Sequence, residues 1–333
     1  MKMIAIGNNF CERDRETLLL YPAGKALTAS VYGKMLGMEV AYLGVLGSDV
    51  ETEHITDTIK QLELDSSHCQ KYKEGEEQPF RLTEEDVSYL KDFDLIYMEH
   101  KKELLEQWND ISTEKGDILY DFGDQWTREQ IQKAAGKLNF ASIKCQTKEE
   151  TIHICQQLQQ CGAKGSIGFY GEQVICFDEH TYMEETMNKA KADDQRGMEQ
   201  AYVIAAIGAL KEQKELSIAM EAGKNFAEQI GREAGYFAHS VPIIKMYGTS
   251  LCKDCVHSLE EIKRHQYPVE FRDFNDKLRN LKHFLKIREA NRELFKEEIE
   301  QGTIGIPLFV LDDGTYTKDE KVAFERIEKQ LAK

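Results

Sequence analysis

The sequence lacks any long apolar run. No stretch approaches the roughly 20 consecutive apolar residues that a membrane-spanning helix needs. The N-terminal segment MKMIAIG is apolar but too short for the hydrophobic region of a signal peptide. We therefore expect no membrane partner and a cytoplasmic location.

A concentrated basic patch is also absent. The formal net charge is −16, and residues 241–333 hold equal numbers of basic and acidic residues, so the negative excess lies in residues 1–240. Nucleic acids and anionic membranes require positive charge on a protein surface. The charge distribution therefore excludes a nucleic-acid partner.

The cysteines form neither a disulfide framework nor a recognisable metal site. Only Cys252 and Cys255 stand as a close pair, so no second pair completes a zinc site and we expect no metal. Single cysteines are most often buried apolar residues. We expect this of the six others, which are Cys11, Cys69, Cys145, Cys155, Cys161 and Cys176.

Short apolar runs alternate with segments of helical spacing. The runs are MKMIAIG, VAYLGVLG, FDLIYME, DILYDF, FASIKC and GSIGFYG, and the segments between them include residues 25–36, 101–109, 128–135 and 148–160. This alternation predicts an α/β fold with a doubly wound parallel sheet covered on both faces.

The chain is long enough for two domains. Its 333 residues, 41% of them apolar, can bury two cores. After two further helical stretches, residues 200–211 and 216–233, a new strand begins at Pro242. We place the boundary between residues 240 and 241, and since no Pro/Ser-rich linker separates the two domains, we expect them to abut.

The second domain carries the sharpest motif, PIIKMYGTSLCKDCVHSLEEIK. A buried-type strand leads through a short turn into a helix that begins at Cys252, where the helix dipole stabilises a thiolate. Cys255 follows one turn later on the same face, within reach of a disulfide. Further on, Pro307 opens an apolar strand in GTIGIPLFVLDDG.

This combination resembles the glutaredoxin and thioredoxin family over residues 242–333. The resemblance implies a thioredoxin fold and a thiol–disulfide oxidoreductase with Cys252 and Cys255 as catalytic residues. It places Lys253, Ile306 and a cis Pro307 against the thiol substrate. It also implies protein or small-molecule disulfides as partners, glutathione or a dithiol as reductant, and no covalently bound cofactor. The Gly-Gly and acidic residue that hold glutathione in that family are represented only by Asp-Asp-Gly at residues 312–314.

The first domain resembles ribokinase-type (PfkB) sugar kinases over nearly all of residues 1–240. The resemblance is carried by YPAGKALTASVYGKMLGMEVAYLGVLGSD, by LYDFGDQW followed by FASIK, and by ADDQRGMEQAYVIAAIGAL. It is closest to the fructoselysine 6-kinases. It implies a ribokinase-like sheet and a cleft for a sugar-amine metabolite.

The family's Asp-Thr-x-Gly-Ala-Gly-Asp motif is degenerate here. Asp194 and Gly197 match it, whereas Met198 and Glu199 replace the small residues of the anion hole and Gln200 replaces the catalytic base. Glutamine cannot act as a general base near neutral pH, and a carboxylate at the helix start repels phosphate. We therefore expect no ATP binding. An alternative one-residue shift would make Glu199 the base.

The substrate positions and the lid of the family are altered as well. The substrate aspartate becomes Asn8, and the Gly-Gly-Asn turn with its following Asn becomes Ala-Gly24-Lys25 and Thr28. Between Tyr72 and Leu82 only a short polar stretch stands where the kinases insert a lid. We therefore expect the lid to be missing and a bound sugar to be poorly shielded from water.

The segment YDFGDQW contains two acidic residues, Asp121 and Asp124. They are interpreted either as a metal-binding pair or as helix caps and solvated loop residues.

For the whole chain three interpretations compete. The first is a thiol–disulfide oxidoreductase fused to a non-catalytic sugar-kinase-like domain. The alternatives are an ATP-dependent fructosamine-type kinase under redox control and a non-catalytic interaction scaffold. The sequence leaves the oligomeric state open.

Overall fold

The computed structural model describes residues 1–72, 80–111, 116–237 and 239–332, and the chain divides into two compact units. The first unit consists of Met1–Cys11 and Pro22–His239, and the second of Glu12–Tyr21 and Ser240–Lys333. Residues 12–21, expected in the first domain, thus cluster with the second unit. Residues 73–79, most of the stretch in which a lid is expected to be missing, lie outside the described residues.

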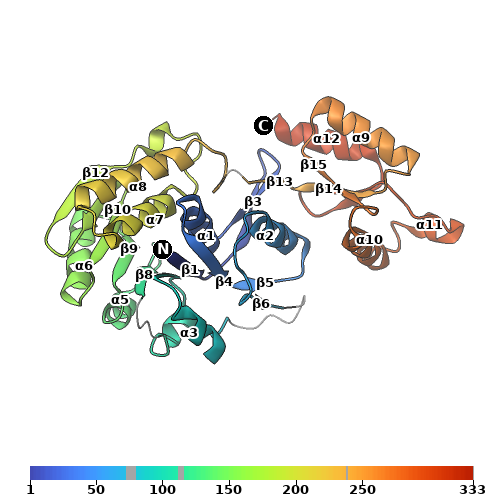
Figure 1. Ribbon diagram of the computed structural model, residues 1–333. Helices are drawn as coiled ribbons and strands as arrows, with labels where there is room; N and C mark the ends of the chain where they lie inside the picture. The colour runs from blue at the N-terminus through green and yellow to red at the C-terminus, as the bar shows by residue number, and fades with distance from the viewer. Residues whose placement is uncertain (73–79, 112–115, 238, 333) are drawn as a thin grey trace. The chain divides into compact units, whose positions relative to one another are not determined.

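The first unit is built on an eight-stranded sheet in the order β12-β11-β10-β9-β8-β7-β1-β4 (Figure 1). The strands are β1 (Lys2–Ile6), β4 (Glu39–Leu43), β7 (Leu95–Glu99), β8 (Asp117–Asp121), β9 (Phe140–Lys144), β10 (Gly165–Tyr170), β11 (Gln173–Phe177) and β12 (Tyr182–Thr186). The pairs from β4 to β10 are parallel, while β11 and β12 run antiparallel at one edge. The six predicted strands are confirmed.

Helices cover both faces of this sheet because alternate residues of a buried strand point to opposite sides. In β1, Met3 and Ala5 join the core that contains residues of α1, α7 and α8, while Ile4 and Ile6 join the core that contains residues of α4, α5 and α6. The helices are α1 (Lys25–Met35), α2 (Val50–Gln61), α3 (Glu84–Leu90), α4 (Lys102–Glu106), α5 (Arg128–Ala135), α6 (Lys148–Gln160), α7 (Met198–Lys211) and α8 (Leu216–Ile230). The doubly wound arrangement is therefore confirmed.

Within the described residues, no helix has the length and apolar character to cross a membrane. Of the six single cysteines, four are buried as expected, namely Cys69, Cys145, Cys155 and Cys176. Cys11 is partly exposed, and Cys161 is exposed because it lies at the C-cap of α6. The expectation of burial was wrong for Cys161.

The second unit contains a four-stranded sheet in the order β15-β14-β16-β17. Its strands are β14 (Ile244–Gly248), β15 (Val269–Asp273), β16 (Leu308–Val310) and β17 (Tyr316–Thr317), and its helices are α9 (Lys253–His265), α10 (Leu278–Ala290), α11 (Lys296–Gln301) and α12 (Glu320–Leu331). Met246 of β14 packs in one core with residues of α9 and α12, and Tyr247 packs in another with Phe284 of α10.

Two small sheets complete the structure. The hairpin of β2 (Phe10–Asp14) and β3 (Leu19–Ala23) joins β13 (Val241–Pro242), and β5 (Val45–Leu46) pairs in parallel with β6 (Gln70–Lys71). β13 pairs antiparallel with β3 at Leu19 and Leu20. The hairpin therefore supplies a strand to the second unit although it lies near the chain's N-terminus.

The hairpin also supplies an apolar anchor to that unit. Leu18 is fully buried against Ile244 and Ile327, and its backbone carbonyl accepts a hydrogen bond from the Ile243 amide at 2.8 Å.

We predict that Leu18→Ala destabilises the second unit by about 2–5 kcal/mol, the usual cost of truncating a buried leucine.

Chemical denaturation followed by hydrogen exchange of residues 240–332 measures this effect. Thr17→Ala, at an exposed neighbouring position, is the matched control and should leave the exchange unchanged. Equal protection in both variants would show that the hairpin does not stabilise the second unit.

Candidate functional site

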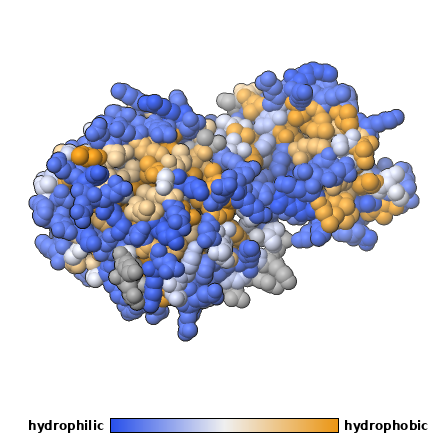
Figure 2. Space-filling model, in the orientation of Figure 1, coloured by the Kyte–Doolittle hydropathy of each residue, from blue (hydrophilic) through white to orange (hydrophobic). Residues whose placement is uncertain are grey.

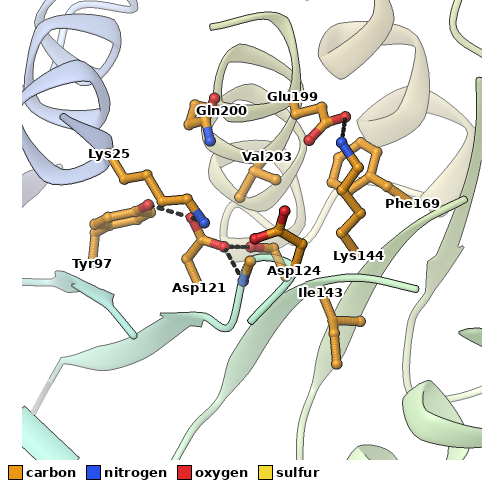
Figure 3. Close-up of a pocket in the computed structure, with 12 residues that line it drawn as sticks. Lys25, Tyr97, Asp121, Asp124, Ile143, Lys144, Phe169, Glu199, Gln200 and Val203 are labelled. Carbon is orange, nitrogen blue, oxygen red and sulfur yellow. Dashed lines mark hydrogen bonds and ion pairs between the residues drawn. The ribbon is translucent and has the colours of Figure 1, made fainter. Parts of the chain in front are cut away.

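A polar cleft of the first unit lies at the carboxyl edge of its parallel sheet. Glu99, Asp121 and Lys144 are the last residues of β7, β8 and β9, which are neighbours in the sheet. Carboxyl ends of parallel strands meet at one edge, which is where ligands bind in open α/β sheets. The starts of α1 and α7 add Lys25 and Glu199 to the same cleft (Figure 3).

Asp121 is held by protein groups on several sides. Its carboxylate accepts the Tyr97 hydroxyl at 2.6 Å, the Ser142 hydroxyl at 2.8 Å and the Gly123 amide at 3.0 Å. The Lys25 ammonium lies 3.5 Å from the Asp121 carboxylate. Lys25 stands where the resemblance to the sugar kinases places the asparagine of the Gly-Gly-Asn turn. Its ammonium group therefore pairs with an acidic residue of the cleft.

Asp124 lines the same cleft from the loop after β8. Over the described parts of the chain, no group of three or more His, Cys, Asp or Glu side chains could hold a metal ion. The contacts of Asp121 favour the interpretation of this segment as a capped loop over that of a metal pair.

Glu199 is paired with two lysines of the cleft. Its carboxylate lies 2.8 Å from the Lys144 ammonium and 2.5 Å from that of Lys189. Burial alone would raise the pKa of Glu199, but the charge of Lys189 and the hydrogen bonds from both lysines outweigh burial and hold the pKa below its usual range. Glu199 is therefore a paired anion rather than a free base.

The turn into α7 depends on glycine. Gly197 is the N-cap residue with φ 77°, and a Cβ there would lie 2.0 Å from the Tyr32 hydroxyl. Met198 is buried behind this turn, and Gln200 lines the cleft beside Glu199 (Figure 3). α7 thus begins where the unshifted comparison with the kinase motif puts it, which disfavours the one-residue shift.

Asp194 stabilises the turn before α7 and is not among the residues that line the cleft. Its carboxylate accepts Arg196 Nε at 2.9 Å and the Gly235 amide at 2.8 Å. Burial would raise the pKa of Asp194, but these hydrogen bonds and the Arg196 charge hold it below its usual range.

Of the predicted sugar-binding positions, Gly24 and Thr28 line the cleft, and Asn8 lies next to Glu99 and Gly24. The Asn8 amide donates to the Glu99 carboxylate at 2.7 Å, and Lys101 donates to the Asn8 side chain. A Cβ on Gly24 would lie 2.3 Å from the Asn8 carbonyl, so the close approach requires glycine. Thr28 is buried, lines the cleft and carries a hydroxyl that has no hydrogen-bond partner.

Four residues of this site were not predicted from the sequence, namely Tyr97, Glu99, Lys144 and Lys189. Three of them lie in or at the end of predicted strands, and the strand-end position of Glu99 and Lys144 was a usable signal. Lys189 lies in the short 3-10 helix η1 (Lys189–Lys191), and nothing in the local sequence marks it.

In the second unit, the cysteine pair stands at the start of α9. Cys252 is the N-cap residue and is partly exposed, whereas Cys255 is fully buried in the core beneath it. Burial, with the neighbouring Cys252, raises the pKa of Cys255 to about 12. Gly248 ends the preceding strand, and a Cβ there would lie 2.5 Å from the Cys255 sulfur.

The other residues predicted for this site, Ile306, Pro307 and Lys253, differ in how they are placed around the cysteine pair. The Ile306–Pro307 peptide bond is cis, and Ile306 packs against the same core cluster as Cys252. Lys253 is exposed on the first turn of α9.

Comparison with known proteins agrees with the geometry of the first unit. Residues 12–121 match the model of the pfkB family carbohydrate kinase. Fructosamine kinase FrlD of Bacillus subtilis is 23% identical over 53% of this chain and 68% of its own length. Fructoselysine 6-kinase of Escherichia coli is 25% identical over 43% of this chain and 59% of its own length.

Solved structures of the ribokinase family share the fold. The ribokinase of Arabidopsis thaliana, solved with ribose and ATP, aligns with a TM-score of 0.59 and 11% identity over 70% of this chain and 93% of that one. The nucleoside kinase of Methanocaldococcus jannaschii aligns with a TM-score of 0.54 and 15% identity over 71% and 93%. The first unit therefore has a ribokinase-like α/β fold, and residues 12–121 of the chain are similar to PfkB-family carbohydrate kinases.

Proposed function

We propose that the first unit binds a sugar amine in the cleft at the carboxyl edge of its sheet and does not transfer phosphate to it. The matched relatives support the carbohydrate-kinase interpretation, which ranked second in the sequence analysis. They give no support to the thiol–disulfide oxidoreductase that ranked first. The ligand class follows from the names of two relatives, a fructosamine kinase and a fructoselysine 6-kinase.

The lining of the cleft suits such a ligand. Its volume is ≈ 460 Å³, enough for a sugar with a short substituent, and its walls carry carboxylates, amides and ammonium groups. The Glu99 carboxylate lines the cleft and can accept a hydrogen bond from an amine or a hydroxyl of the ligand.

The absence of phosphoryl transfer rests on one observation, the start of α7. Gln200 stands at the base position and has no proton affinity near neutral pH. The neighbouring Glu199 carboxylate is locked by two lysines and its pKa is lowered, so it takes up a proton poorly. It also places negative charge at the helix N-terminus, where a transferred phosphate would need bare amides.

We predict that the wild-type protein binds no magnesium-ATP at millimolar nucleotide and that Gln200→Asp alone restores no kinase activity. A base contributes only about 10²–10⁴-fold, and the anion hole would still be filled. The triple change Met198→Ala, Glu199→Gly and Gln200→Asp should recover nucleotide binding before turnover. Isothermal titration of ATP and ADP, with a coupled assay on fructoselysine, tests this.

Two outcomes would replace this proposal with an active kinase. One is micromolar ATP binding by the wild type. The other is phosphorylation of fructoselysine by the wild type or by Gln200→Asp.

We predict that fructoselysine binds the wild type and that Glu99→Gln weakens binding about tenfold or more, since a charged hydrogen bond contributes about 1.5–3 kcal/mol. Burial raises the pKa of Glu99 above 4.5, because the Asn8 amide and Lys101 do not cancel it. The carboxylate is therefore lost as the pH falls toward that raised pKa, and the affinity should fall in the same direction.

Titration calorimetry between pH 7.5 and 5 measures both effects. Glu106→Gln, an exposed carboxylate on α4, is the matched control and should bind as the wild type does. A Glu99→Gln variant with unchanged affinity at every pH would remove Glu99 from the binding site.

A second function is favoured by the cysteine pair of the second unit. We propose thiol–disulfide exchange at Cys252, with Cys255 as the resolving thiol. Cys252 stands at a helix start, where the dipole stabilises a thiolate, and Cys255 lies buried behind it. The β14-α9-β15-α10-α11-β16-β17-α12 order and the position of Pro307 directly before β16 support a thioredoxin fold.

The surface next to Cys252 is open to a partner. Figure 2 shows hydrophobic residues exposed on the visible face of the second unit. Leu251, directly before Cys252, is 84% exposed. Ile306, Pro307 and Lys253 stay predictions for contacts to the thiol substrate.

We predict that Cys252→Ser abolishes disulfide reduction, whereas Cys255→Ser accumulates mixed disulfides at Cys252. The reason is that a buried thiol with a pKa of about 12 is protonated at neutral pH and attacks only after a disulfide has formed beside it. Thiol trapping with mass spectrometry measures the reactivity of each. Greater reactivity of Cys255, or no reactivity of either, would contradict the assignment.

A further inference from the structure

A groove of ≈ 270 Å³ lies beside the cysteine pair of the second unit. It is formed by the start of α9, the segment before β16 and the start of α12. Asp254, between the two cysteines in sequence, lines it together with Ile306 and Pro307. A disulfide that reaches Cys252 along Pro307 would therefore bring its neighbouring residues into this groove.

The charges of the groove are mostly negative. Its carboxylates are Asp254, Glu298 and Glu320, and its basic groups are Lys318 and His257. The Lys318 ammonium lies 2.5 Å from Glu298, and it also lies 5.6 Å from the centre of the Phe295 ring. Lys318 is thus paired with Glu298, and its positive charge balances only that carboxylate.

The other two carboxylates are not neutralised in this way. Glu320 accepts the Ser258 hydroxyl at 2.6 Å and lies 3.5 Å from the His257 ring. Asp254 is exposed at the rim. The groove therefore presents an excess of negative charge to whatever enters it.

We propose that this groove selects disulfides held in cationic peptide segments, with lysine or arginine beside the cysteine, over glutathione disulfide. Glutathione carries two carboxylates and one ammonium group, so its net charge is repelled by the groove, while a basic side chain is attracted. The inference rests on the thiol–disulfide exchange proposed above and names its substrate class.

The reaction balances without any bound cofactor. The Cys252 thiolate attacks one sulfur of the substrate disulfide, forming a mixed disulfide and releasing the first substrate thiol. The Cys255 thiol loses its proton and attacks the Cys252 sulfur, which releases the second substrate thiol and leaves Cys252 and Cys255 as a disulfide. A dithiol such as dithiothreitol then reduces the protein, becoming oxidised itself.

The experiment compares the kcat/KM of the full-length protein for three peptide disulfides that differ only in flanking Lys, Gly or Glu residues. Hydroxyethyl disulfide serves as a neutral small substrate and glutathione disulfide as the anionic one. We expect the Lys peptide to react at least tenfold faster than the Glu peptide. The difference should shrink with added salt, because salt screens exposed charges.

The variant Asp254→Asn with Glu320→Gln should reduce the ratio of Lys to Glu peptide several-fold. Glutamine keeps an acceptor for the Ser258 hydroxyl, so the fold of the groove is retained. Glu297→Gln removes one exposed charge from α11 outside the groove lining and should leave the ratio unchanged. The ratio is the readout because the absolute rate also reflects the reactivity of Cys252.

Equal rates for the three peptides, or a preference for the Glu peptide or glutathione disulfide, would overturn the charge selectivity. If hydroxyethyl disulfide is reduced in that case, thiol–disulfide exchange itself stands. Failure to reduce any of the substrates would overturn both proposals together.

Discussion

Burial of the parallel strands on both faces is the constraint on which the first unit depends. Because helices cover both sides of β1, β7, β8 and β9, the strands meet solvent only at their ends. The carboxyl ends place Glu99, Asp121 and Lys144 beside one another although they are far apart in sequence. The polar cleft is therefore a consequence of the sheet order.

The chemistry of this cleft is governed by how its charges pair. Lys25 lies against Asp121, and two lysines hold Glu199 at the start of α7. The Glu199 carboxylate places negative charge at the N-terminus of α7, the end of the helix whose dipole attracts anions. A ribokinase-like fold is thus combined with a helix start that carries a carboxylate paired with two lysines.

In the second unit the candidate site is formed by one short segment at the start of α9, whereas the cleft of the first unit is formed by the edge of a sheet. The turn after β14 places Cys252 at the surface and Cys255 in the core, so their environments differ although they are one helical turn apart. The same unit depends on the hairpin near the N-terminus, whose Leu18 is buried against Ile244 and Ile327. Removal of residues 12–21 would expose that core.

Local periodicity and contiguous motifs were sufficient to predict part of this structure. Alternating apolar runs predicted the strands β1, β4, β7, β8, β9 and β10, and the Gly197 turn and the cysteine pair were readable because their residues are adjacent in the chain.

The contacts between side chains that are distant in sequence could not be predicted in this way. The pairing of Glu199 with Lys144 and Lys189, the contact of Tyr97 with Asp121, and the capture of Leu18 by the second unit each join segments that no local pattern connects. Such contacts depend on strand order and helix placement, which arise from packing of the whole chain. The charge state and accessibility of the site residues follow from that packing and could not be read from their identity alone.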